Sequence, residues 1–299
     1  MQRLSADAPP NNQSGVSSEI VGFTPRTIDW NAVRVFAEKN LRIAMRYPAN
    51  ILVWAFLPLM WFAPYVLMMV AIGGGSSVHF TEISGFEDFI AFAVIGWFVY
   101  TYVDTTIWSI GQNFRWEQFS GTLEPLFVAP VPRTSILIGA AISDTVSTSI
   151  SALIMLGTSC IIFGVGYAVT AIVPIILVLM MMVVALFGFG FMIAGLIIVF
   201  KDPSVLTELI DNVVFALSPV SYPIQVLPRA AQVAAYALPA TIAIMTIREL
   251  AIGGAAEVVS FLSTIGALGL LIVAFWVLGL LCFRYAERWT KKRGSMGGF

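Results

Sequence analysis

The distribution of apolar residues constrains this chain more than any other feature of its sequence. Apolar runs near or above the ~20 residues needed to cross a bilayer follow one another from Ile51 to Phe283. Hydrophobic residues make up 59% of the chain and charged residues 11%, with a mean hydropathy of +0.89. These values exclude an ordinary soluble domain. We therefore expect an all-α integral membrane protein.

The pattern predicts six transmembrane helices, over residues 51–72, 89–112, 136–163, 171–200, 205–222 and 261–283. The fifth run begins with polar turns that contain Glu208, Asp211 and Asn212. We expect these three residues at the cytoplasmic interface, where they would gate or line the inner mouth of a path through the protein.

The distribution of basic residues predicts the orientation of the spans. Of the 16 Lys and Arg residues, all but Arg229 and Arg248 lie before the first span, after the second, fourth or last span, or in the C-terminal part. By the positive-inside rule both termini are cytoplasmic, and we expect a multi-pass protein of a prokaryotic plasma (inner) membrane. The net charge of −1 excludes an extended nucleic-acid-binding surface.

The two ends of the chain differ from the hydrophobic part. Residues 1–28 are rich in Pro, Ser and Asn and predict a disordered cytoplasmic tail, and residues 287–299 predict a basic cytoplasmic tail. Residues 29–48 have helical period, with apolar and basic side chains on opposite arcs, Asp29 as N-cap and Pro48 as stop. This amphipathic helix lies on the membrane surface or packs on protein, and the two are compatible. Residues 49–286 form the six-helix transmembrane domain.

A polar, turn-rich loop over residues 113–133 separates the second and third spans. From Gly121 to Arg133 it reads GTLEPLFVAPVPR. Thr122 can cap a helix and Glu124 suits its first turn, while Leu123 and Leu126 begin a small apolar face. A helix this short is marginal in water, so we expect a partner surface for it.

This loop resembles the cytoplasmic loop of the type-2 permease family of ATP-binding-cassette (ABC) transporters, in which a glycine, a Leu-Glu pair, a leucine and a proline recur at this spacing. The resemblance implies a cytoplasmic coupling helix that docks on a separate ATPase subunit. The positions that it implies for ATPase coupling are Glu117, Gly121, Thr122, Leu123, Glu124, Leu126, Pro130 and Arg133.

The segment over residues 219–258 extends the resemblance. It is apolar, but Pro219, Pro223, Pro228 and Pro239 interrupt it too often for one continuous span. Broken helices are tolerated in a membrane where protein or a water-filled cavity covers their free backbone groups. In the family such helices re-enter the membrane from outside before the last span. The order Leu238-Pro239 and then Arg248 is similar to the family's Asn-Pro and Arg pattern, with Leu in place of Asn.

The sequence carries no ATP-binding loop of the form G-x-x-x-x-G-K-[ST] and no protease or hydrolase motif. We therefore expect a transport subunit and not an enzyme, binding no cofactor itself. ATP and Mg would sit on two copies of a partner ABC ATPase. Six spans are few to enclose a substrate path across the membrane, so we expect a homodimer. One histidine gives no histidine-based metal site.

Polar and aromatic side chains inside the spans are candidates for the substrate path, because such faces avoid lipid. The candidates are Trp97, Tyr100, Thr101, Asp104 and Trp108 of the second span, Asp144 of the third and Phe215 of the fifth. Packing between helices is the alternative for each. The second-span face favours substrate contact, because aromatic and acidic groups suit amphipathic or cationic ligands. For the third span packing is favoured.

The leading hypothesis is the permease subunit of an ATP-driven ABC exporter. It would move a hydrophobic or amphipathic substrate (drug, antibiotic, lipid or glycan-linked lipid) out of the cell by alternating access. One alternative is an ion-gradient-driven secondary transporter that uses Asp104 and Asp144, although the internal repeats of such transporters are not visible. A non-transporting membrane anchor for a soluble ATPase is another.

Overall fold

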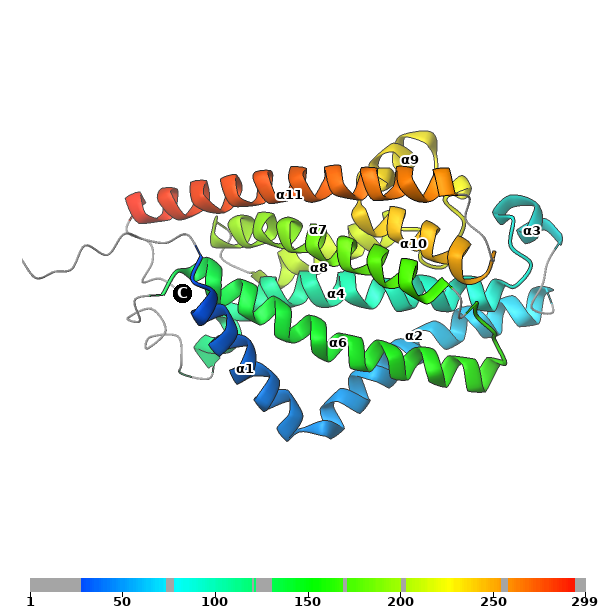
Figure 1. Ribbon diagram of the computed structural model, residues 1–299, viewed down its shortest axis with the longest axis horizontal. Coiled ribbons are helices and arrows are strands. Elements are labelled where there is room, and N and C mark those ends of the chain that lie inside the picture. The colour runs from blue at the N-terminus through cyan, green and yellow to red at the C-terminus, as the bar shows by residue number, and fades with distance from the viewer. Residues whose placement is uncertain are drawn as a thin grey trace, which may run out of the picture.

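The computed structural model describes residues 28–73, 78–119, 121, 131–168, 171–199, 203–253 and 258–293, and over these residues it is helical without any strand. Four long helices lie side by side along the long axis of the molecule (Figure 1). They are α4 (Phe89–Phe119), α6 (Arg133–Phe163), α7 (Ile172–Val199) and α11 (Val258–Arg293). Helix α2 (Pro48–Gly73) crosses beside α6, and the short α3 (Val78–Ser84) follows it.

Helices α2, α4, α6, α7 and α11 are each long and apolar enough to span a membrane. They correspond to the first four and the last of the predicted spans. The remaining prediction, over residues 205–222, is wrong in length, because α8 (Pro203–Leu217) has 15 residues. At 1.5 Å per residue it is roughly 22 Å long, shorter than a ~30 Å hydrocarbon core. The apolar run continues through Pro219, but the helix does not.

Two short helices form the broken segment that the prolines predict. Helices α9 (Arg229–Tyr236) and α10 (Pro239–Ala251) meet at 89°, and together they are apolar enough to count as one interrupted span. The described part of the chain therefore holds five spanning helices, or six with this bent pair. A 3₁₀ turn, η2 (Ile224–Val226), links α8 to α9. Helix α9 lies at the end of the molecule opposite the C-terminal end of α11 (Figure 1).

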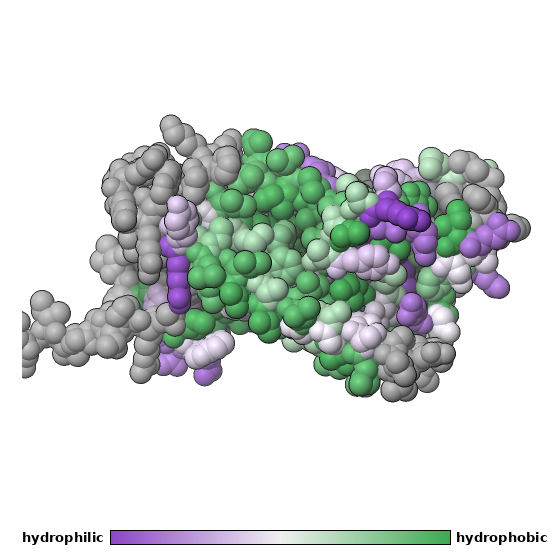
Figure 2. Space-filling view, turned by 90° about the horizontal axis from the view of Figure 1, so that it is seen from above, coloured by the Kyte–Doolittle hydropathy of each residue, from purple (hydrophilic) through white to green (hydrophobic). Residues whose placement is uncertain are grey.

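Helix α4 is the centre of the bundle. In its spanning part 78% of the residues are buried, against 17% for α2 and 11% for α11. It contacts α6, α7, α8 and α10. The outer surfaces of α2 and α11 are apolar and exposed, as expected of helices that face lipid. Seen from above, hydrophobic residues cover the middle of the molecule and hydrophilic residues gather toward its two ends (Figure 2).

Helices α7 and α11 pack with their backbones in contact. A Cβ atom at Gly279 would lie 2.2 Å from the carbonyl oxygen of Gly188, and one at Gly188 would lie 2.7 Å from the backbone of Phe275. Small residues allow the two backbones to approach closely. Such close van der Waals packing stabilises helix pairs in a membrane, where the surrounding lipid is as apolar as the side chains and gives no hydrophobic driving force. The indole N–H of Trp276 also donates to the Val184 carbonyl at 2.8 Å.

Helix α1 (Trp30–Arg46) confirms the predicted N-terminal amphipathic helix and its N-cap, because Asp29 accepts a hydrogen bond from the Asn31 N–H. Pro48 ends it and begins α2. Its buried side chains, Val33, Phe36 and Ala37, face α6, where Gly139 leaves room for them. The Asp29 N–H also donates to Ser135 Oγ at 2.8 Å. The helix therefore packs on protein, and its place on the membrane surface stays a prediction.

Several predicted segments fall outside the described residues. These are the N-terminal tail up to residue 27, the centre of the coupling loop at residues 122–130, the turn at residues 200–202 and the last six residues, 294–299. The apolar spanning part of α11 ends at Ala286, and the helix continues to Arg293. The boundary predicted at residue 286 stays a prediction.

Candidate functional site

Three of the predicted path residues form one aromatic cluster between α4 and α8. The ring centroid of Phe215 lies 5.5 Å from that of Trp97 and 5.0 Å from that of Tyr100. The Trp97 indole N–H donates to Ser221 Oγ at 3.0 Å, just beyond the end of α8. Aromatic rings at these distances and tilts attract one another, so this cluster fixes α8 against the central helix.

Two carboxyl groups adjoin the aromatic cluster. The Tyr100 hydroxyl donates to Asp211 Oδ1 at 2.6 Å and also approaches the Asp211 carbonyl oxygen at 3.0 Å. Asp104, one turn along α4, lies near enough to Asp211 for the two carboxyl groups to interact electrostatically. Among the described residues, no Lys or Arg forms an ion pair with either group. The site is thus acidic on one side and aromatic on the other.

The position of Asp211 corrects the expectation that it lies at the cytoplasmic interface. Its partner Tyr100 is near the middle of the span Phe89–Ser109. The sequence places Asp211 near the start of an apolar run, but α8 runs alongside α4 and brings it beside the middle of that span. Exposed neighbours Glu208 and Asn212 do not join the cluster.

Two further candidates on α4 lie apart from this cluster. The Thr101 hydroxyl donates to the Trp97 carbonyl oxygen of its own helix at 2.9 Å. Trp108 is 36% exposed. Neither makes a recorded contact with Asp211 or Phe215 among the described residues. The compact part of the predicted path is therefore Trp97, Tyr100, Asp104 and Phe215.

Asp144 belongs to a different group of polar side chains, between α4 and α6. Its carboxylate accepts a hydrogen bond from the Ser109 hydroxyl. Along the same pair of helices, Thr148 bonds Thr105 at 3.0 Å and Tyr102 bonds Ser149 at 3.2 Å. Hydrogen bonds of this kind hold helices together within a membrane. This arrangement agrees with the packing interpretation favoured for the third span.

Sequence reasoning missed the part played by Arg248, a side chain of α10 that is 2% exposed. Its guanidinium donates to three backbone carbonyl oxygens: Phe92 at 2.9 Å, Pro219 at 2.6 Å and Val220 at 2.6 Å. It also stacks on the Phe92 ring, 3.4 Å from the centroid. One side chain thus ties α10 to α4 and to the turn after α8, and two of its acceptors, the carbonyl groups of Pro219 and Val220, lie beyond the end of α8, where no helix satisfies them.

Gly96 makes this arrangement possible. A Cβ atom there would lie 1.9 Å from the Val220 carbonyl oxygen and 2.3 Å from the Arg248 guanidinium. No side chain fits at these distances. The turn after α8 and the guanidinium therefore both contact the backbone of α4 directly. The sequence shows a lone arginine in an apolar segment, which marks Arg248 as unusual. Its three partners are backbone carbonyl groups, which every residue has, so the sequence could not identify them.

Three of the predicted ATPase-coupling residues belong to the described part of the chain, where α4 ends and α6 begins. Glu117 is in the last turns of α4, exposed Gly121 has a φ of 68°, and Arg133 is the first residue of α6. Such a positive φ is the left-handed conformation that glycine adopts readily, and it fits a chain turning away from a helix. Residues Thr122, Leu123, Glu124, Leu126 and Pro130 lie outside the described part, so the coupling helix stays a prediction.

Comparison with known proteins assigns the family. The sequence profile of the ABC-2 type transporter family matches residues 31–252, from the first turn of α1 to the end of α10. This region is more than half of the 299 residues and includes the α4–α8 cluster and the loop before α6. A search of curated proteins found no match. Permeases of this family are transmembrane subunits that generally lack an ATPase site and work with an ABC ATPase. The chain therefore belongs to the ABC-2 type transporter family and is a multi-pass ABC transporter permease.

Proposed function

We propose that this chain is the permease subunit of an ATP-driven exporter that moves a hydrophobic or amphipathic substrate out of the cell. The observation that carries the proposal is the family match over residues 31–252, which spans the loop between α4 and α6. The sequence has no ATP-binding loop of its own. A separate ATPase, binding ATP and Mg, would supply the energy.

The length of α4 supports a coupling role for this loop. The spanning part of α4 ends at Ser109, but the helix continues to Phe119. These additional turns extend the helix by roughly 15 Å. They would carry the loop beyond the hydrocarbon region to the level where a soluble ATPase can bind it, with Glu124 and Leu126 in the contact.

The α4–α8 cluster supports an amphipathic substrate with a cationic group. Trp97, Tyr100 and Phe215 offer apolar and π surface, and Asp104 and Asp211 offer two carboxyl groups without a basic partner among the described residues. Aromatic faces and carboxylates both attract organic cations. A lipid or drug of this type would enter from the bilayer or cytoplasm and leave on the outer side.

The proposed assembly is a two-fold homodimer with one ATPase subunit below each copy. Two copies enclose a path on the symmetry axis, the simplest closed arrangement for identical subunits. Closure of the two ATPase subunits on ATP would rock the permease halves between inward and outward access. In this assembly both termini are cytoplasmic and α9 and α10 re-enter the plasma membrane from outside, as the distribution of basic residues favours.

The test is to purify the tagged chain from its own membrane in mild detergent and to measure the associated ATP hydrolysis. We expect a Walker-motif ATPase in equal amount with measurable turnover. Changing Glu124→Ala and Leu126→Ala together should reduce both association and hydrolysis about tenfold or more, because a docking helix loses its apolar and charged contacts. Glu87→Ala, an exposed acid at the other end of α4, is the matched control and should change neither.

Two outcomes would contradict the proposal. The chain emerging alone, under conditions that preserve other membrane complexes, would remove the ATPase partner. Full hydrolysis and association with the doubly changed loop would remove the coupling role of Glu124 and Leu126 and leave the family assignment intact.

A further inference from the structure

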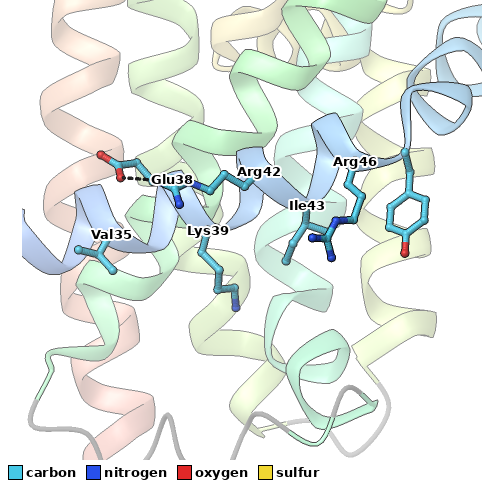
Figure 3. A pocket seen from close by; sticks show the side chains of 7 residues that line it. Val35, Glu38, Lys39, Arg42, Ile43 and Arg46 are labelled. Atoms are coloured by element: carbon cyan, nitrogen blue, oxygen red, sulfur yellow. Dashed lines mark ion pairs between the residues drawn. The ribbon is translucent and has the colours of Figure 1, made fainter.

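Helix α1 carries a hollow on its outward side. The hollow has a volume of about 570 Å³ and is lined by Val35, Glu38, Lys39, Arg42, Ile43, Arg46 and Tyr47. Lys39, Ile43 and Arg46 project from the same side of the helix (Figure 3). The lining thus combines three basic groups with apolar and aromatic side chains.

The hollow has a surplus of positive charge. Its one acid, Glu38, is engaged by Arg34 on the same helix, with Nε 2.8 Å from Oε1, and by Arg42 at 3.8 Å. The hydrogen bond and the charge of Arg34 lower the pKa of Glu38. The lining holds three basic residues, Lys39, Arg42 and Arg46, against the one acid, so its formal net charge is positive. Arg34, which lies outside the lining, meets much of the Glu38 charge. Arg46 makes no ion pair within the described residues.

The hollow lies where the chain enters the membrane. Arg46 and Tyr47 immediately precede Pro48, the first residue of the spanning part of α2. Basic and aromatic residues at the start of a span lie at the depth of the lipid headgroups. Val35 and Ile43 of the lining are 67% and 53% exposed to their surroundings. Exposed apolar side chains beside cationic groups suit a molecule that has an anionic head and an apolar body.

We propose that this hollow binds the phosphate of an anionic phospholipid in the leaflet that faces α1. The arginine side chains present planar guanidinium groups that pair with phosphate through two parallel hydrogen bonds. The Lys39 ammonium, held 4.3 Å from the centroid of the Phe36 ring, adds a third positive charge. Val35 and Ile43 contact the glycerol and the first methylene groups.

Bound lipid would have a mechanical consequence for the bend between α1 and α2. The inner face of α1 is already fixed to α6 through Val33, Phe36 and Gly139. A lipid on the outer face fixes the other side of the same helix. The first span would then keep its angle to α1 while neighbouring helices move. This inference concerns lipid binding and does not depend on the ATPase partner.

The test measures bound lipid by native mass spectrometry of the full chain in detergent. Phosphatidylglycerol and phosphatidylcholine with identical acyl chains are titrated separately. We expect preferential retention of phosphatidylglycerol. Arg42→Gln and Arg46→Gln should each weaken that retention roughly fivefold, the effect of one basic group at an anionic surface. Arg284→Gln, an exposed arginine of α11 outside the hollow, is the matched control and should leave it unchanged.

Three results would overturn the proposal. An equal loss with Arg284→Gln would indicate general surface charge and not a site. Displacement of the lipid by millimolar glycerol phosphate would indicate a site for free phosphate. Unchanged lipid retention with loss of a co-purifying protein would identify the hollow as a protein-docking surface. Arg46→Gln breaks no recorded ion pair, so its effect on lipid is separable from misfolding of α1, which thermal unfolding would reveal.

Discussion

At the scale of single residues, two intramembrane acids of similar sequence context have different surroundings. Asp144 accepts a hydrogen bond from Ser109 and lies in a line of hydroxyl groups between α4 and α6. Asp104 meets a second carboxyl group, Asp211, beside an aromatic cluster. Two carboxyl groups in contact cannot both ionise without cost, and a bound cation relieves that repulsion. The Asp144 carboxylate already has a hydrogen-bond partner in the protein. The pair of carboxyl groups at Asp104 and Asp211 would be stabilised by a cationic ligand.

This difference predicts a selective effect of Asp104→Asn. Export of a cationic amphipathic dye should fall roughly tenfold, equivalent to ~1.4 kcal/mol of lost interaction, while export of a neutral dye of similar size is retained. Asp144→Asn, the matched control, should affect both dyes equally and mildly. The measurement is dye efflux from membrane vesicles of known orientation. Equal losses of both dyes in Asp104→Asn would assign that residue to packing.

The sequence predicted the α4 residues of this site but not all of their partners. Helical periodicity placed Trp97, Tyr100 and Asp104 on one face, because their spacing alone determines it. The partners Asp211 and Ser221 are more than a hundred residues away along the chain. Their depth depends on how α8 packs, which residue type does not encode.

At the scale of helices, one arginine and one glycine join α10 to α4 and to the turn after α8. Arg248 donates to the carbonyl oxygens of Phe92, Pro219 and Val220, and Gly96 leaves the space for both the guanidinium and the turn after α8. Removing a buried side chain that donates to three carbonyl groups costs far more stability than removing one at the surface. These polar contacts add to the apolar packing of α10, whose Ile244 and Ile247 side chains lie in the hydrophobic core.

Gly96→Ala should separate α10 and the turn after α8 from α4. Its Cβ atom would meet backbone oxygen at 1.9 Å, which only backbone movement can relieve, so we expect a loss of at least ~3 kcal/mol in stability. Gly157→Ala in α6 has nothing within 4 Å of the new Cβ atom and should be neutral or stabilising. Thermal unfolding in detergent compares the two. Equal unfolding temperatures would contradict the tight contact at Gly96.

Hydropathy located the long helices well but misjudged the length of α8. Runs of apolar residues determine which segments enter a membrane, so five spans were identified with ends within a few residues of the structure or extended by polar turns. In the fifth run, Ser218 and Pro219 are followed by further apolar residues, and hydropathy continues past the point where the helix ends. Proline at 219 was the available signal, because its ring opposes helix continuation.

At the scale of the whole molecule, the proposed exporter draws energy from ATP on another chain. Depleting cellular ATP while the ion gradient is maintained should stop dye export, because ATP drives the proposed cycle. Collapsing the gradient with an ionophore while ATP is present should leave most export intact. Fluorescence of the retained dye, followed in cells under each condition, is the measurement.

The reverse result would favour a secondary transporter. Cells that carry the changed Glu124 and Leu126 provide the control, since their export should already be low under both conditions. Export that survives ATP depletion and ends with the gradient would make the acids of α4 and α6 ion-coupling groups. That outcome would also contradict the proposed ATPase partner.

The glycine contacts between α7 and α11 decide which parts of the permease can move. Where Gly279 meets the Gly188 carbonyl, two backbones touch without side chains between them. Such a joint has no rotamers to rearrange, so sliding one helix past the other would force peptide groups into one another at every step. We therefore expect these two helices to move together as one rigid unit. In the proposed transport cycle, the change between inward and outward access would therefore occur elsewhere, at the hydrogen-bonded contacts of α4 with α8 and α10.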